Sequence, residues 1–596
     1  MQTDVYQAAV AALQRNNPEL ALQHLADTGF QRPEHWLLKA QILFQQHQSA
    51  EAIAVLQQGL LKFPAASQIR STLAQLFSRQ KNYQAIIDLF EHQQSVPDAQ
   101  AVAALFDALL QLKYYKRASK LSRQLKGRQD KTLLWLQVKL LLETQQLALG
   151  IQLLQQALQL YPGDLHFRHS LANAFKDTGR VADALPLFLA LQRDFPQHVE
   201  ICYSIACTYY ELQQADLCEQ WLKHTLELAP NYVPAHESLN KLYWGQGKTE
   251  ALHSSYQLVM QRYQPHPDLQ ASLISQLLRS GQSEQAADTA DQALRAHPAE
   301  ARFHHLKAVS LSYLDLDEQA FPFYLQAAAM APDSARYQID LANHYLKQAD
   351  YQKADQHLQA ALPQNPDNQE LWAYLGLVWR LAGDERHMWL NNYDHLLRVM
   401  ELPVPAGFSR KEDFLFELTQ YIRSLHQHQK RQPLDQSVRA GTQSEGHFLA
   451  SPHPLVQAFR RSVEHCIQTY LAALPKDPKH PTCRRNNGSY LLNGSWSVQL
   501  GRGGFHSNHV HPAGWLSAPS YIEVPACMSA ADPTKSGWLK LGETCLGLGD
   551  REEIAREICP QAGQIILFPS FFWHGTYPLL SAEPRSTIPC DLQPVN

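Results

Sequence analysis

Apolar positions in the first two thirds of the chain recur with a spacing that predicts paired helices. In successive units of 34 residues, the eighth position is small, the eleventh is large and the twentieth is alanine. Small side chains let the two helices of a unit approach closely, and the large one fills the groove to the next unit. These positions are Ala172, Ala206, Ala308 and Ala342; Phe175, Tyr209, Leu311 and Tyr345; and Ala184, Ala286, Ala320 and Ala354.

Prolines close these units, because proline cannot continue the hydrogen-bond ladder of a helix. These prolines recur every 34 residues, and we call this series of positions the proline grid. One expected position is occupied by Gln264, with Pro265 beside it, while Pro64 and Pro97 indicate earlier and more degenerate units. Helix pairs closed by a proline at this period are typical of tetratricopeptide (TPR) repeats. Dividing the span up to residue 368 by the period predicts about eleven helix pairs. The prolines on the grid are Pro162, Pro196, Pro230, Pro298, Pro332 and Pro366.

The repeat changes character around Leu371. An aromatic segment, Val378–Leu390, leads into a helix that we expect to end near Glu401, and Leu402–Gly407 consists of turn formers. We therefore predict a first domain at residues 1–401, a TPR solenoid with capping helices, and a second domain at residues 402–596.

The second domain begins with two expected helices, Lys411–His428 and Pro454–Ala473. Beyond Pro481 the pattern changes to short runs of strand formers separated by glycine and proline. Such strands after helices favour a β-sandwich or jelly roll supported by helices, so the whole chain is expected to be a multidomain α + β protein. The expected strands lie within Gly488–Leu500, Trp515–Val524, Gly563–Phe568 and Arg585–Leu592.

Composition excludes several classes of partner. The chain is 45% hydrophobic and 18% charged, and its formal net charge of -4 comes without a run of basic residues that would track nucleic acid. No stretch reaches the roughly 18 apolar residues of a membrane span. The nine cysteines are dispersed, which favours free thiols in a reducing compartment. We expect a cytoplasmic protein that binds neither nucleic acid nor a membrane.

Three histidines lie within six residues of the second domain: His506, His509 and His511. In a strand, residues two apart project to the same face, so His509 and His511 can converge on one metal ion. Pro512 then ends the ladder. As alternatives, His506 could cap a turn and the other two could form a satisfied polar pair.

A second segment, Phe568–Thr576, places His574 at a turn just after an apolar strand. If a hairpin follows, Arg585 returns beside His574, where its guanidinium could hold a carboxylate through two hydrogen bonds. A surface ion pair is the common alternative for an arginine. We expect Phe572 and Trp573 to belong to the core rather than to a substrate cage.

Non-haem Fe(II) oxygenases hold their metal through three side chains on one face. The layout His509-x-His511 with a distant His574 resembles that of bacterial TPR-containing 2-oxoglutarate–Fe(II) oxygenases, relatives of the prolyl-hydroxylase-type dioxygenases. The resemblance implies a double-stranded β-helix fold, Fe(II), 2-oxoglutarate and O₂, with His574 as the distal histidine and Arg585 as the 2-oxoglutarate-binding arginine. We also assign Thr587 and Ser517 to 2-oxoglutarate. The matching stretches are Pro433–Gln443, Gly503–Ser517, Gly537–Gly542 and Gly563–Thr576.

The sequence departs from the wider superfamily at one position, since no Asp or Glu stands two residues after His509. All three histidines could bind iron, or two could bind with water completing the shell, or the site could have lost its metal. We favour His509, His511 and His574 as ligands and expect His506 to support them from behind.

The leading hypothesis is an oxygenase that hydroxylates a protein or peptide held in the solenoid groove. One alternative is an oxygenase for small molecules whose repeats serve only assembly, including a homodimer. Another is a scaffold protein with an inactive oxygenase domain. Arg585 argues against an inactive domain, whereas the missing carboxylate argues mildly for it.

Overall fold

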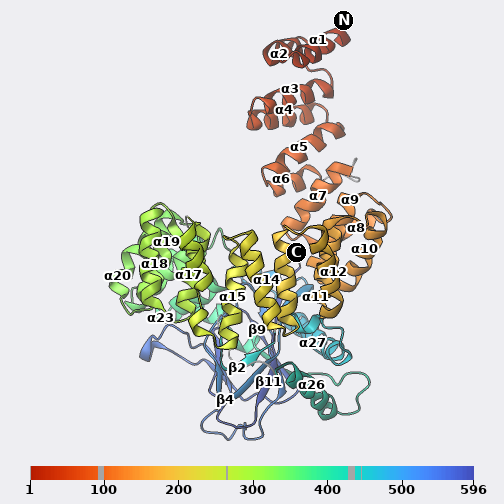
Figure 1. Cartoon of the computed structure of the whole chain (residues 1–596). Helices are drawn as coiled ribbons and strands as arrows, with labels where there is room; N and C mark the ends of the chain where they lie inside the picture. Colours follow the sequence, from red (N-terminus) through yellow and green to blue (C-terminus); the bar gives the residue numbers. More distant parts are fainter. Residues whose placement is uncertain (1, 92–98, 264–265, 427–435, 445, 596) are drawn as a thin grey trace. The chain divides into compact units, whose positions relative to one another are not determined.

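The computed structural model describes residues 2–91, 99–263, 266–426, 436–444 and 446–595 (Figure 1). The chain forms two compact units, Met1–Phe167 with Val595–Asn596, and Arg168–Pro594. No helix in the described ranges is both long and apolar enough to cross a membrane. Expected features that lie outside the described residues are Pro97, Gln264, Pro265, residues 427–428 of one helix and residues 433–435.

The first unit is built from helices throughout its described part. Asparagine and aspartate side chains begin several of them by accepting a hydrogen bond from the backbone N–H three residues on, as Asn17 does from Leu20 at 3.1 Å. The helices are α1 (Gln2–Gln14), α2 (Pro18–Asp27), α3 (Pro33–Gln45), α4 (Ser49–Lys62), α5 (Ser67–Arg79), α6 (Tyr83–Leu89), α7 (Ala99–Gln111), α8 (Tyr115–Gln124), α9 (Lys131–Glu143) and α10 (Leu147–Leu160).

The helix pairs continue into the second unit without a change of pattern. One helix pair is irregular. It precedes Gln264, the position of the proline grid that lacks a proline, and in it a 3-10 turn, Thr249–Ala251, precedes a short helix. The helices are α11 (Leu165–Asp177), α12 (Val181–Asp194), α13 (Val199–Glu211), α14 (Ala215–Leu228), α15 (Val233–Gln246), α16 (Ser254–Arg262), α17 (Pro267–Arg279), α18 (Ser283–Ala296), α19 (Ala301–Ser312), α20 (Asp317–Met330), α21 (Ala335–Lys347) and α22 (Tyr351–Ala361).

The TPR interpretation is confirmed at the level of packing. The alanines at the eighth and twentieth positions of the units are completely buried, including Ala172, Ala184, Ala342 and Ala354. α12 and α20 each end two residues before a grid proline. The small residues therefore lie where helices meet, and the prolines lie where helices stop.

Side chains one repeat apart join neighbouring units. The donor and acceptor are 34 or 35 residues apart, about the length of one repeat. Each bond therefore joins the first helix of one unit to the first helix of the next. We call these bonds the repeat ladder. It consists of His169–Ser204 at 3.1 Å, Tyr203–Ser238 at 3.0 Å, Glu237–Ser272 at 2.8 Å, His305–Asp340 at 2.6 Å and Arg336–Glu370 at 2.7 Å.

The expectation of a helix that ends near Glu401 is wrong. After α23 (Gln369–Leu381), α24 (Arg386–Leu390) and α25 (Tyr393–Leu396), the chain forms a strand, β1 (Arg398–Glu401). The backbone is already extended at residue 397, and β1 pairs antiparallel with β9 of the sheet. The domain boundary between residues 401 and 402 stays a prediction. The sheet nevertheless includes a strand, β1, that precedes this boundary in the sequence.

The remaining strands form a curled antiparallel half-barrel, as expected for a double-stranded β-helix, supported by α26 (Lys411–His426) and α27 (Pro454–Ala473). The large sheet has the order β2-β4-β11-β6-β9-β5-β12-β3, and a small sheet has the order β10-β7-β8. The strands are β2 (Val438–Gln443), β3 (Tyr490–Ser495), β4 (Val498–His506), β5 (Leu516–Ser517), β6 (Ser520–Glu523), β7 (Leu539–Leu541), β8 (Arg556–Ile558), β9 (Gln564–Pro569), β10 (His574–Thr576), β11 (Arg585–Ile588) and β12 (Cys590–Pro594).

One hydrophobic core runs from the last repeats into the half-barrel. It includes Tyr345 of α21, Trp372 of α23, Tyr470 of α27 and Phe568 of β9. Trp573 packs edge-to-face against Tyr374 of α23, with ring centroids 5.4 Å apart. The end of the array therefore supports the half-barrel directly.

Candidate metal centre

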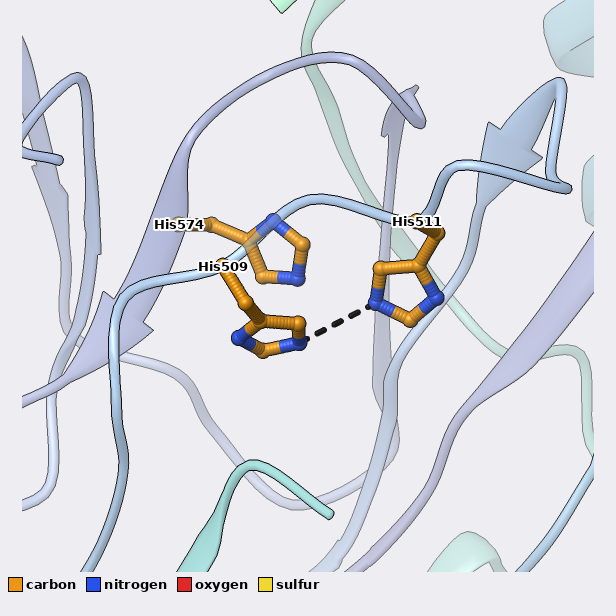
Figure 2. Close-up of side chains that lie close together, drawn as sticks. All are labelled: His509, His511 and His574. Atoms are coloured by element: carbon orange, nitrogen blue, oxygen red, sulfur yellow. Dashed lines mark hydrogen bonds between the residues drawn. The ribbon is translucent and has the colours of Figure 1, made fainter. Parts of the chain in front are cut away.

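Three histidines from two segments of the half-barrel domain converge (Figure 2). His509 and His511 lie between β4 and β5, and His574 is the first residue of β10. One ring nitrogen from each lies within 4.8 Å of the others. In Figure 2 the three rings gather around a common point, with the His509 and His511 Nε2 atoms 3.1 Å apart. The structure thus brings together the three predicted ligands.

The local backbone explains this convergence. The N–H of His509 donates to the carbonyl of His574 at 2.9 Å, and the N–H of His574 donates back to His509 at 3.1 Å. The segment that carries His509 and His511 is not the strand that we expected, because this bridge is isolated. The N–H of His511 instead donates to the carbonyl of Ser570 at 3.0 Å, and Pro512, which lacks an N–H, begins a turn.

Hydrogen bonds fix the tautomer of each ring. The Nδ1 atom of His509 lies 2.7 Å from the Ser507 carbonyl, and that of His574 lies 2.9 Å from the Phe572 carbonyl. The Nδ1 atom of His511 lies 2.5 Å from the Asp591 carboxylate. Since these acceptors cannot donate, each Nδ1 carries a proton, so in the neutral form of each ring Nε2 is the nitrogen that presents a lone pair.

The Nε2 spacing fits a metal ion. A proton on one of the two Nε2 atoms makes their 3.1 Å contact a hydrogen bond, whereas two unprotonated nitrogens at this distance repel unless a cation lies between them. Imidazole nitrogens bind first-row metals at about 2.1 Å, and two of them at a right angle are then about 3 Å apart. The donor set therefore fits a divalent transition metal held on one face.

Asp591 is the site residue that the sequence interpretation missed. Its carboxylate accepts from His511 and, at 2.9 Å, from the hydroxyl of Ser517. The one available signal was an acidic residue between two apolar ones, Cys590 and Leu592. Burial lowers the pKa of His511, but the charge and hydrogen bond of Asp591 outweigh burial, so this pKa lies above its usual value. No carboxylate stands two residues after His509, but the Asp591 carboxylate is hydrogen-bonded to the Nδ1 atom of His511, the residue at that position.

The other two rings are neutral. Burial, followed by the neighbouring His511, lowers the pKa of His509 to about 3. Burial likewise holds the pKa of His574 well below its usual range. Neutral imidazole is the form that binds metals, so the site is prepared for an ion without prior loss of protons from these two rings.

A cavity of about 480 Å³ opens beside the three histidines and contains Arg585. This arginine is 1% exposed, and burial lowers its pKa. Its Nη1 donates to the Gly537 carbonyl at 2.5 Å, while Nε has no hydrogen-bond partner among the described residues. A buried guanidinium without a carboxylate partner in the described chain is costly, so the site fits an anionic ligand such as a dicarboxylate.

The hairpin predicted to carry Arg585 back to His574 is wrong. β10 pairs with β7, whereas β11 pairs with β4 and β6. Arg585 reaches the cavity because β11 lies in the middle of the large sheet and points this side chain inward. The commonplace alternative of a surface ion pair does not fit so deep a burial.

The remaining expected residues lie in different surroundings. Thr587 lines the cavity together with Arg585. The hydroxyl of Ser517 is 2% exposed and contacts Ser570 and Asp591, so its assignment to 2-oxoglutarate stays a prediction. His506 lines the cavity outside the group of three, 6.2 Å from His509 between ring centroids. Phe572 and Trp573 are buried, as expected for core residues.

Comparisons with known proteins agree with this architecture. The family model described as "Putative 2OG-Fe(II) oxygenase" matches residues 494–591, a stretch that contains the three histidines, Arg585 and Asp591. Tetratricopeptide-repeat models match residues 37–99, 135–199, 199–232 and 339–385. No curated protein matches the chain.

Two solved structures match this chain at low similarity. The Cut9–Hcn1 hetero-tetramer of the APC/C is 12% identical over 64% of this chain and 90% of that chain, with a TM-score of 0.26. Yeast Tom70 is 11% identical over 65% of this chain and 96% of that chain, with a TM-score of 0.30. At these scores neither likeness indicates how this chain works.

Proposed function

We propose that this chain, which joins TPR repeats to a domain of the 2OG–Fe(II) oxygenase family, is a 2-oxoglutarate- and Fe(II)-dependent dioxygenase that hydroxylates a protein or peptide. One observation carries the proposal. Three imidazoles present their Nε2 lone pairs to one point, and a buried arginine without an anionic partner in the described chain lines the same cavity.

Each residue has a separate task in this proposal. His509, His511 and His574 would hold Fe(II), and Asp591 keeps the ring of His511 oriented and basic. Arg585 would hold the far carboxylate of 2-oxoglutarate in the cavity. When bound, Fe(II), 2-oxoglutarate and O₂ supply the oxidising chemistry, in which 2-oxoglutarate is converted to succinate and CO₂. The part of the cavity around Arg585 is buried, with Tyr521, Leu539 and Thr587 at most 4% exposed, which limits access of water there.

The array supports a macromolecular substrate. A solenoid of helix pairs offers an extended groove that suits a peptide. Because the last repeats and the half-barrel share one core, a peptide bound to those repeats would be held at a fixed position relative to the cavity. A small-molecule substrate, with repeats that serve assembly or homodimer formation, is the competing outcome.

The test begins with anaerobic titration of the full chain with Fe(II) and then 2-oxoglutarate. Succinate is measured after O₂ is admitted with candidate peptides, and the peptides are analysed by mass spectrometry for the gain of one oxygen atom. Arg585→Ala should bind the metal normally but need far more 2-oxoglutarate. Arg502→Ala, which removes an exposed arginine of β4, is the matched control and should behave as wild type.

Two outcomes would contradict the proposal. Failure of the wild-type chain to bind Fe(II), or equal 2-oxoglutarate dependence in Arg585→Ala and wild type, would rule out the assigned site. Oxidation of free amino acids or other small molecules, with no peptide oxidised, would instead support the small-molecule alternative.

A further inference from the structure

A loop of the oxygenase domain lies between the metal centre and the last repeats. Residues 542–555, here named the β7–β8 loop, connect β7, the central strand of the small sheet, to β8 at its edge. β7 pairs with β10, with Leu541 opposite His574. The loop therefore leaves the small sheet directly beside a predicted metal ligand.

Asn508 joins this loop to both ligand segments. Its Nδ2 donates to the Glu543 carboxylate at 2.8 Å and to the Thr544 carbonyl at 2.9 Å. Asn508 immediately precedes His509. On its other side, a Cβ added to Gly575, the residue after His574, would lie only 2.2 Å from the Asn508 Oδ1. The side chain thus fills a slot between the loop and the bridge that joins His509 to His574.

The loop is braced internally by Glu552. Its carboxylate accepts from the Thr544 N–H at 3.0 Å, from the Thr544 hydroxyl at 2.6 Å and from the Leu548 N–H at 3.2 Å. Three hydrogen bonds to one carboxylate restrict the loop to a single shape. A displacement of one end is therefore felt at the other.

The far side of the loop contacts two consecutive first helices of the array. Arg551 donates to the carbonyls of Leu346 at 2.9 Å and Lys347 at 3.1 Å, at the C-terminal end of α21. These last carbonyls lack helical partners and carry partial negative charge, so a guanidinium is stabilised there. Glu553 pairs with Arg380 of α23 at 3.1 Å. Arg380 also donates to the Arg551 carbonyl at 3.0 Å, so the loop is anchored on both of these neighbouring repeats.

We propose that Asn508 is a positioning residue for the metal ligands and that the β7–β8 loop transmits the relative position of α21 and α23 to them. A peptide that changes the angle between these repeats then changes the metal centre, because each repeat holds its own anchor. Each repeat of a solenoid contacts only its neighbours, so such a change is local to the occupied repeats. The proposal rests on the metal site of the proposed function.

The test titrates the full chain with Co²⁺ by calorimetry and records the visible absorption of the bound metal. Asn508→Ala should bind Co²⁺ roughly 10- to 100-fold more weakly, the range for groups that orient a ligand. Arg551→Ala touches no ligand and should lose roughly 2- to 30-fold, the range of coupling through a network. Arg551→Lys keeps a donor for the α21 carbonyls and should lie between Arg551→Ala and wild type.

Arg484→Ala is the matched control. Arg484 also joins the domain to the array, through the Pro366 carbonyl at 2.6 Å and the Asp367 carboxylate at 2.6 Å, but lies outside the loop. The Arg484→Ala variant should show the same decrease in melting temperature as Arg551→Ala, if there is one. Its Co²⁺ affinity and absorption spectrum should equal those of the wild type. Unchanged Co²⁺ binding in Arg551→Ala, or an equal loss in Arg484→Ala, would overturn the proposal and leave the proposed function standing. A wild-type chain that binds no Co²⁺ would overturn both.

Discussion

At the scale of single residues, the unusual feature is that His511, two residues after His509, is an imidazole hydrogen-bonded to a buried carboxylate. Asp591 lies 2.5 Å from the Nδ1 of His511, so a negative charge remains next to the metal position without occupying it. This arrangement predicts that His511 acts as a ligand and that Asp591 controls how well it does so.

We predict that His511→Ala weakens metal binding about as much as His509→Ala, because each removes one of three converging nitrogens. His511→Asp should restore the common set of two histidines and one carboxylate and keep the metal. His506→Ala should cost only about 10- to 100-fold, since this ring lies outside the group of three. Calorimetric titration with Fe(II) or Co²⁺ compares the four variants. Normal metal binding by His511→Ala would show that this ring is only structural.

We predict a shift in the pH dependence of metal binding for Asp591→Asn. The pKa of His511 is raised, so its proton competes with the metal up to a higher pH, and affinity falls as pH drops through that pKa. Without the carboxylate, burial alone acts and lowers the pKa, so the fall should move to lower pH. At high pH the variant should still bind about 10- to 100-fold more weakly. Co²⁺ titrations between about pH 5.5 and 8.5 would show this, since the range brackets ordinary histidine titration. An unmoved midpoint would contradict the assignment.

The spacing of His509, His511 and His574 was enough to predict that these three side chains converge, because local patterns place them near strand ends and turns. Arg585 was predicted to line the same site from the family resemblance, and it does line the cavity. Asp591 could not be predicted with its partner, because their contact spans 80 residues and depends on which strands are neighbours. The hairpin to Arg585 failed for the same reason, since strand order in a half-barrel is not written in local sequence.

At the scale of elements, β1 has the largest consequence. It pairs with β9, next to the segment that carries His574, and it follows the helices that cap the array. A four-residue strand alternates too briefly to be distinguished from the end of a helix by its sequence pattern. The repeats, in contrast, were predictable because their 34-residue period is sampled many times.

We predict that a truncated chain beginning at Leu402 does not fold. It lacks β1 and α23, whose buried side chains include Leu371, Trp372 and Leu375. Each large buried side chain stabilises by about 1.5–3 kcal/mol, and a domain has only about 5–15 kcal/mol in total. A chain beginning at Gln369 keeps these elements and should retain a cooperative melting transition. It should also still bind Co²⁺, roughly 2- to 30-fold more weakly because the α21 carbonyls that hold Arg551 are absent. Equal melting temperatures for the two chains would show that β1 and α23 are dispensable.

At the scale of the whole molecule, the two compact units suggest separable tasks. Each contains its own buried clusters, and repeats are stabilised by their neighbours rather than by distant parts of the chain. The three converging histidines of the candidate metal centre all lie within the second unit.

We predict that a chain beginning at Gly163 keeps its metal affinity but turns over a protein substrate less efficiently. It preserves Asp164, which accepts from the Phe167 N–H at 2.9 Å at the start of α11, while it loses groove surface. Co²⁺ titration and kcat/KM with the identified peptide are the measurements. Equal kcat/KM for both chains would assign substrate recognition to the second unit alone.

The repeat ladder also constrains how this gene can change in length. Because each side-chain bond joins residues 34 or 35 positions apart, a single inserted or deleted codon shifts every partner across that junction out of phase. Duplication or loss of a complete unit leaves all remaining partners in phase. Inherited variation in the length of the array is therefore expected in whole multiples of the unit, with the spacing inside each unit unchanged.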